Sequence, residues 1–144
     1  MTPEAKAAGD PRLLSPLALA FVGDGVYELL VREMLVAGGT MPVRELHRRA
    51  VAQVRAAAQS QAYQAIQELL DEEEMAVLRR GRNAHGTRPP RSSDPADYRR
   101  ATGVEALFGY LYLCGRNGRI RELFGEICRR CPAEAQEENG QEEE

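Results

Sequence analysis

Apolar residues recur along this chain at helical spacing, and residues that cap helices stand where the apolar segments begin. Ser15 fits an N-cap before Pro16, and the apolar segment that follows extends to about residue 37, where two glycines end it. A second helix is predicted to begin near Pro42. Its apolar face comprises Val43, Leu46, Ala50, Val51, Val54 and Ala58.

Four further helices are predicted after it, over residues 61–70, 71–82, 94–115 and 120–131. The 71–82 segment is rich in acids in its first turn and in arginines in its last, which suits the helix dipole. No segment alternates apolar and polar residues with period two, as a half-buried strand would. The sequence therefore predicts an all-α fold, built as a helical bundle.

The distribution of charge separates one folded domain from two tails. The 144 residues suffice for a single domain with a real core. The net charge is −3, but the last thirteen residues carry six acids and no base, so the rest of the chain has a formal charge of +3. We expect a flexible arm over residues 1–11, a folded domain over 12–131 and a disordered acidic tail over 132–144.

Nothing in the sequence suggests export or a membrane. The N-terminus lacks the basic and apolar regions of a signal peptide, and charged residues interrupt the longest apolar stretches. The cysteine count is odd, at three, and Cys128 and Cys131 lack the second ligand pair that a structural zinc site needs. These features predict a reduced, cytoplasmic protein.

Two acids stand alone in apolar helices. Asp24 is the only charge in the segment 17–27, and Glu105 is the only charge in the segment 101–113. Burying an ionised carboxylate costs several kcal/mol unless something pairs with it. If the two helices pack together, the acids can face each other across a cation, and carboxylate oxygens suit Mg²⁺. The alternative is two separate buried acids, each neutralised by an arginine or a helix N-terminus.

A basic segment precedes the helix that carries Glu105. It contains one histidine, five arginines and no acid: Arg79, Arg80, Arg82, His85, Arg88 and Arg91. Guanidinium groups bind phosphate oxygens bidentately, so the segment suits contact with a nucleic acid backbone, although a solvated basic loop would have the same composition. A cation site joined to a phosphate-binding loop suggests metal-assisted phosphodiester chemistry. His47 and His85 are ambiguous between solvated surface residues and phosphate contacts.

Several segments together resemble a known family. The segment 19–28, Leu-Ala-Phe-Val-Gly-Asp-Gly-Val-Tyr-Glu, resembles the signature helix of the ribonuclease III catalytic domain, and the segment 102–113 resembles that domain's second acidic helix. The segments 45–50, 59–62 and 78–84 agree as well. The closer resemblance is to Mini-ribonuclease III, the short branch without a double-stranded RNA-binding domain, and it covers about residues 13–130.

The resemblance implies an all-α homodimer that cuts double-stranded RNA. It matches Asp24 and Glu105 to the family's metal-binding acids, with Mg²⁺ as cofactor and Mn²⁺ as a substitute. Ordinary ribonuclease III has two more carboxylates in these helices. This chain has Ala20 and Thr102 at those positions, and the Mini branch also lacks the two carboxylates. Family membership also implies products with a 5′-phosphate and a 3′-hydroxyl, and maturation of large-subunit ribosomal RNA precursors, with a ribosomal protein as a further partner that could present the substrate.

Without an RNA-binding appendage, the catalytic domain itself must supply the RNA contacts. The expected contact residues are Arg79, Arg80, Arg82, His85, Arg88 and Arg91 of the basic segment and Arg48 of the second helix. Recognition should use the shape, phosphates and 2′-hydroxyls of A-form RNA. Two alternatives stay open: a catalytically inactive RNA-binding module or ribosome-associated scaffold, and a purely structural helical dimer.

Overall fold

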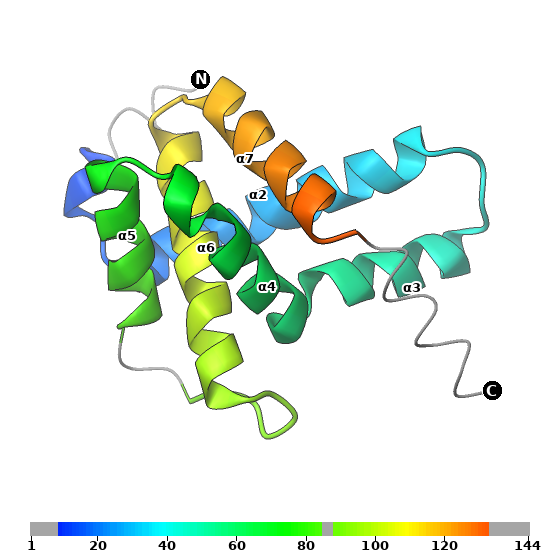
Figure 1. Cartoon of the computed structure of the whole chain (residues 1–144), viewed down its shortest axis with the longest axis horizontal. Coiled ribbons are helices and arrows are strands. Elements are labelled where there is room, and N and C mark those ends of the chain that lie inside the picture. Colours follow the sequence, from blue (N-terminus) through cyan, green and yellow to red (C-terminus); the bar gives the residue numbers. More distant parts are fainter. Residues whose placement is uncertain (1–8, 85–87, 133–144) are drawn as a thin grey trace.

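The computed structural model describes residues 9–84 and 88–132, and this part of the chain is helical without a β-strand (Figure 1). The elements are η1 (Pro11–Leu13), α2 (Pro16–Ala37), α3 (Val43–Val54), α4 (Ala56–Ile66), η2 (Gln67–Leu69), α5 (Glu72–Arg82), α6 (Pro95–Leu113) and α7 (Asn117–Arg130). The all-α prediction is confirmed. His85, most of the predicted arm and nearly all of the predicted acidic tail lie outside the described residues.

Side-chain caps fix the start of three helices where the sequence predicts them. The Ser15 hydroxyl accepts the Ala18 N–H at 3.1 Å at the start of α2. Asp71 forms a reciprocal capping box with Glu74 at the start of α5, and Asp94 caps α6. Each cap satisfies backbone N–H groups that have no partner within the helix, so these boundaries are set by local chemistry.

The boundary between α3 and α4 differs from the prediction. The second helix was expected to continue through Ala58, but Arg55 has an extended backbone with ψ 156°, and a new helix begins at Ala56. No glycine or proline marks this break, since the residues that follow Arg55 are three alanines. The break lets α3 pack on α2 while α4 packs on the central helix, so it is set by tertiary packing.

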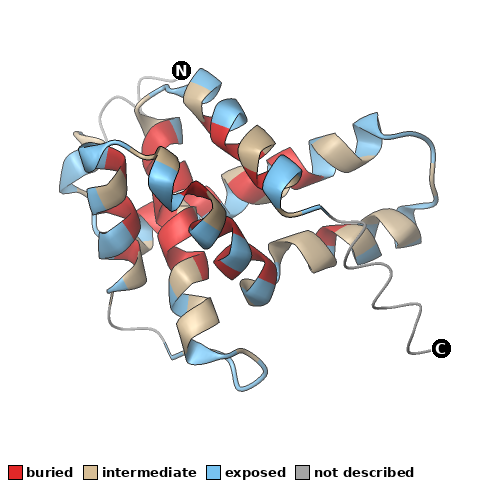
Figure 2. Ribbon diagram, viewed as in Figure 1, coloured by how far each residue is buried: buried red, intermediate tan, exposed pale blue. Residues whose placement is uncertain are grey.

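The central helix of the bundle is α6. It contacts α2, α4, α5 and α7, and most of its middle is buried (Figures 1 and 2). Tyr27 of α2 lies edge-on to the rings of Phe108 in α6 and Phe124 in α7, with centroids 5.3 and 5.6 Å apart. No helix in the described residues is long and apolar enough to span a bilayer. The core therefore fixes α6 as the scaffold on which the other helices place their side chains.

Small residues bring α2 and α6 into backbone contact where they cross. A β-carbon on Gly109 of α6 would lie 1.9 Å from the backbone oxygen of Leu19 in α2, so only glycine fits there. Gly23 makes the matching approach from α2. The two acids singled out in the sequence lie beside this crossing, Asp24 next to Gly23 on α2 and Glu105 on α6.

Candidate metal and RNA site

The carboxyl of Asp24 faces that of Glu105 where α2 crosses α6. Asp24 is near enough to raise the pKa of Glu105, so the structure brings together the acids that the sequence singles out. Their burial differs from the expectation, because Asp24 is exposed and Glu105 is half-buried. Apolar neighbours in the sequence suggested two buried acids, but Asp24 lies on the solvent side of α2. The pair thus has one carboxylate on the surface and one that is partly covered.

The environment of Glu105 strongly favours its protonated form. Burial, and after it the nearby carboxyl of Asp24, together raise the pKa of Glu105 to about 8, while the amide of Gln59 acts in the opposite direction. Among the described residues, no lysine or arginine forms an ion pair with either acid. Within that part of the chain, the acids are therefore not neutralised by arginines of their own. A bound cation would supply the missing positive charge.

Gln59 is a third polar residue at this site, and the sequence analysis did not single it out. It lies on α4 with a side chain only 2% exposed. It shares the buried face of that helix with Ala62, Tyr63 and Ile66. The sequence did contain a signal for this residue. Gln59 is followed by apolar residues at i+3, i+4 and i+7, which places it on the apolar face of the helix, and an amide on such a face usually has a polar partner.

The donor set fits a hard divalent cation with incomplete protein coordination. No group of three or more His, Cys, Asp or Glu side chains that could hold a metal comes together within the described residues. Ala20 and Thr102 are both buried, and the Thr102 hydroxyl donates to the Tyr98 carbonyl at 2.9 Å, so neither adds a ligand. Mg²⁺ commonly binds one or two carboxylates and keeps several waters or substrate oxygens. Asp24 and Glu105 meet that requirement.

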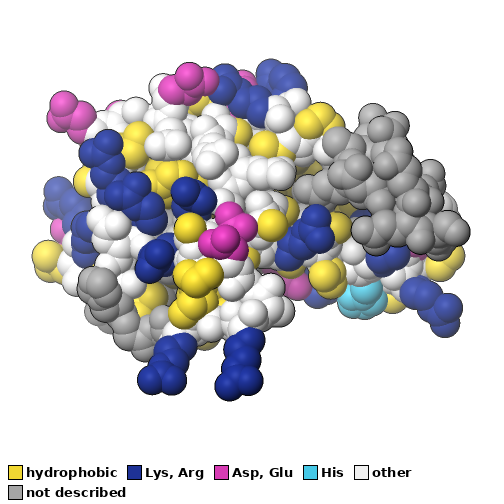
Figure 3. All heavy atoms as spheres, turned by 60° about the horizontal axis from the view of Figure 1, so that its bottom comes forward, with side chains coloured by type: hydrophobic (Ala, Val, Ile, Leu, Met, Phe, Trp, Pro, Cys, Tyr) yellow, Lys and Arg dark blue, Asp and Glu magenta, His cyan; other side chains and the backbone are white. Residues whose placement is uncertain are grey.

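Exposed arginines gather at the end of α5 and in the segment that leads to α6. Arg79, Arg80, Arg88 and Arg91 are all exposed, and Figure 3 shows basic side chains clustered on the face that carries this segment. Arg80 also donates to the Leu14 carbonyl at 3.3 Å. The predicted basic surface is thus present in the described residues, while His85 lies outside them.

Two further residues predicted to contact RNA, Arg82 and Arg48, also have structural partners. Arg82 is half-buried, donates to the Tyr63 hydroxyl at 3.0 Å and lies over the Tyr63 ring. Arg48 lies on α3, which packs on α2 and α4, and forms an ion pair with Glu45. Arg82 therefore anchors the end of α5 to α4, and the structure does not gather Arg48 with the arginines of the α5–α6 segment.

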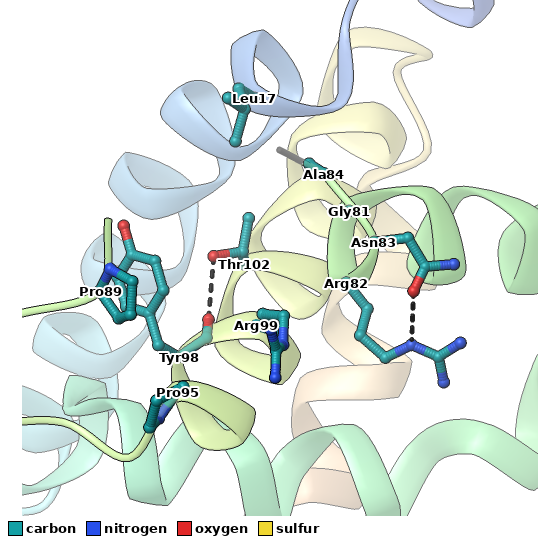
Figure 4. Close-up of a pocket in the computed structure, with 10 residues that line it drawn as sticks. All are labelled: Leu17, Gly81, Arg82, Asn83, Ala84, Pro89, Pro95, Tyr98, Arg99 and Thr102. Atoms are coloured by element: carbon teal, nitrogen blue, oxygen red, sulfur yellow. Dashed lines mark hydrogen bonds between the residues drawn. The ribbon is translucent and has the colours of Figure 1, made fainter. Parts of the chain in front are cut away.

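A cavity of about 420 Å³ lies between the start of α6 and the end of α5 (Figure 4). Its wall combines Thr102 and Arg99 of α6 with Gly81 of α5 and Leu17 of α2. Thr102 lies one helical turn before Glu105, so α6 links this cavity to the acid pair. The cavity and the exposed arginines flank one end of the central helix.

The chain is similar to proteins of one family over most of its length. The model of the "Ribonuclease III domain" family matches residues 17–116. A protein of Symbiobacterium thermophilum named Mini-ribonuclease 3 is 47% identical, over 79% of this chain and 88% of its own length. The Mini-ribonuclease 3 of Brevibacillus brevis is 45% identical, over 79% and 85%. A crystal structure of a Fusobacterium nucleatum protein has a TM-score of 0.75 at 32% identity, covering 83% of this chain and 92% of that one.

Proposed function

This chain belongs to the ribonuclease III family, in its Mini-ribonuclease 3 group, and from that membership we propose that it is a Mg²⁺-dependent endoribonuclease of double-stranded RNA. The observation that carries the proposal is the pairing of Asp24 with Glu105 at the α2–α6 crossing. Two neighbouring acids without an arginine partner among the described residues can both ionise only if a positive charge joins them, so they suit a site that is completed by a cation.

The two acids would bind the ion in different ways. Asp24 is exposed and would present its oxygens from the solvent side, while Glu105 must give up its proton before it can bind a cation. When bound, Mg²⁺ would lower the pKa of a water molecule and stabilise charge on the leaving oxygen. The water oxygen bonds to phosphorus as the bond to the 3′ oxygen breaks and that oxygen takes up a proton. The products carry a 5′-phosphate and a 3′-hydroxyl.

The exposed arginines supply the proposed contact with RNA. Three exposed arginines lie near the start of the helix that carries Glu105: Arg79, Arg88 and Arg91. Their guanidinium groups can bind phosphates without contacting the bases. A-form RNA hides its base edges in a deep, narrow major groove, so such contacts suit a duplex. The family resemblance further points to large-subunit ribosomal RNA precursors as substrate, with a ribosomal protein presenting them. A cytoplasmic location is part of the same proposal.

We propose a homodimer as the active form. Large apolar side chains remain exposed along α2, among them Phe21 at 84%, Leu29 at 64% and Val36 at 64%. An apolar stripe of this kind on one helix is typical of a protein interface. A second copy of the chain would cover it, and Phe21 lies one turn from Asp24, so the dimer would enclose the edge of each acid pair. Sedimentation of wild-type protein and of Phe21→Arg tests this, with a monomeric wild type as the contradicting result.

One assay separates the proposed nuclease from its alternatives. The purified protein is incubated with a long RNA duplex in Mg²⁺ and, in parallel, in EDTA. Metal-dependent cleavage supports the nuclease. Salt-sensitive binding without cleavage would instead identify a catalytically inactive RNA-binding module, for which the loss of two acids at Ala20 and Thr102 is the favouring observation. A protein that neither binds nor cleaves the duplex would support the third alternative, a purely structural dimer.

A further inference from the structure

A buried amide without a partner lies next to the acid pair. The Nε2 atom of Gln59 has no hydrogen-bond partner, and it is the only buried side-chain nitrogen or oxygen of that kind within residues 9–84 and 88–132. Buried polar groups in native proteins are nearly always paired, because leaving one unpaired forfeits its hydrogen bonds to water. An orphan of this kind therefore calls for an explanation in a state other than the one described.

The surroundings of Gln59 point that amide toward Glu105. The side chain lies on the face of α4 that packs against α6, and its amide favours the ionised form of Glu105. The buried amide donor therefore lies unpaired on the helix face that packs against the helix of Glu105.

We infer that Gln59 is a positioning residue for Glu105: its Nε2 donates to one carboxylate oxygen of Glu105 while the other oxygen holds a divalent cation. This inference rests on the proposed function. Groups that donate to a metal ligand orient it and strengthen its binding, and their loss commonly weakens metal affinity by about ten- to a hundredfold. Gln59 itself touches neither the cation nor the RNA in this arrangement.

The inference predicts opposite effects on the metal-free and metal-bound protein. Gln59→Met keeps the length and volume of the side chain and removes the orphan donor, so the melting temperature in EDTA should stay the same or rise. Gln61→Met is the matched control, because Gln61 is exposed on the same helix two residues away. Gln59→Leu provides a second apolar side chain if the methionine packs poorly.

The probe for the bound state is Mn²⁺, measured as free ion by electron paramagnetic resonance without RNA. We expect Gln59→Met to weaken Mn²⁺ binding about ten- to a hundredfold and Gln61→Met to bind like the wild type. Duplex cleavage by Gln59→Met should be lost at low Mg²⁺ and return at saturating Mg²⁺. A residue with a purely structural role would lower the melting temperature in EDTA and would not shift the Mg²⁺ dependence.

The outcomes separate this inference from the proposed function. If wild-type protein binds no Mn²⁺, the proposed metal site itself is wrong. If the wild type binds Mn²⁺, Asp24→Asn does not, and both Gln59 variants bind like the wild type, the metal site stands and the role of Gln59 is overturned. A large fall in the EDTA melting temperature of both Gln59 variants would also overturn it, because the amide would then already have its partner in the metal-free protein.

Discussion

Gly23 of α2 lies directly against the backbone of Glu105 in α6. A β-carbon at position 23 would be 1.6 Å from the Glu105 carbonyl oxygen and 2.8 Å from the backbone nitrogen of Gly109, and real atoms cannot approach so closely. The contact is between two helix backbones, so no side-chain movement can relieve it. This approach sets the separation of α2 and α6, and with it the distance between Asp24 and Glu105.

Gly23→Ala should therefore separate the two helices and damage both fold and site. We expect a loss of about 3 kcal/mol in the free energy of unfolding, at the upper end of the cost of overpacking, measured by urea denaturation. Gly125→Ala is the control, because a β-carbon at that helical position meets nothing within 4 Å. The control should be neutral or gain about 0.5 kcal/mol. Equal stabilities for the two variants would mean that the helices can move apart at no cost.

The raised pKa of Glu105 makes the metal-free protein sensitive to pH. The pKa is about 8 in the folded chain against 4.5 as the ordinary value, so the native state holds the proton more tightly than the unfolded state. This contribution is fully present below pH 4.5 and is lost as the pH rises through 8. We expect the free energy of unfolding in EDTA, measured by urea denaturation, to fall by roughly 3 to 4 kcal/mol between pH 5 and pH 8.

Glu105→Gln should remove that dependence, because the amide neither titrates nor repels Asp24. The variant should be at least as stable as the wild type at pH 8 in EDTA, and the two should converge toward pH 5. A large loss of stability in Glu105→Gln at pH 8 would instead identify Glu105 as a structural acid whose charge the fold requires, and a shared metal site would then be ruled out.

The exposed arginines of the α5–α6 segment should govern duplex affinity. Changing Arg88 and Arg91 together to alanine should weaken binding to a long RNA duplex and reduce the slope of log affinity against log salt by about one per lost phosphate contact. The measurement uses an Asp24→Asn background without Mg²⁺, at several salt concentrations. Arg121→Ala on α7 is the control, since Arg121 is exposed and pairs with Glu33. Unchanged affinity and slope in the double variant would exclude this segment from the RNA path.

Arg82 belongs to a different class from these arginines. Its bond to the Tyr63 hydroxyl joins the end of α5 to α4, so Arg82→Ala should lower the melting temperature by several degrees even without RNA. Arg79→Ala, one turn earlier and exposed, should leave the melting temperature unchanged. If both variants melt like the wild type, the Arg82–Tyr63 contact contributes nothing to the fold, and Arg82 returns to the set of candidate RNA contacts.

The starts of α2, α5 and α6 were predictable from the sequence because each rests on a local cap, whereas α4 and α7 begin at Ala56 and Asn117, earlier than the predicted residues 61 and 120. The acid pair was predictable because each acid is the only charge in an apolar segment. Ser15, Asp71 and Asp94 cap helices through their own side chains, and a lone acid in an apolar run is visible without a structure. The exposure of Asp24 was not predictable, because it depends on the side of α2 that the crossing with α6 leaves open. The expectation that both acids are buried was wrong for this reason.

The break at Arg55 and the role of Gln59 depend on long-range packing. Nothing in the alanines after Arg55 ends a helix, and the chain turns there because α3 and α4 pack on different partners. Gln59 was visible only as a polar residue on an apolar helix face, and its place beside Glu105 follows from the packing of α4 on α6. Sequence patterns can locate candidate residues such as Gln59, but the packing of the helices determines which residues lie next to them.

Asp24→Asn tests the central claim most directly, because it keeps the shape of the side chain and removes one of the two charges proposed to hold the cation. Cleavage of a long RNA duplex is followed at saturating Mg²⁺, with folding checked by thermal melting and duplex affinity measured separately. The account predicts a fall in cleavage on the order of a thousandfold or more, while folding and duplex binding persist. Near-normal cleavage by a folded Asp24→Asn protein would contradict it.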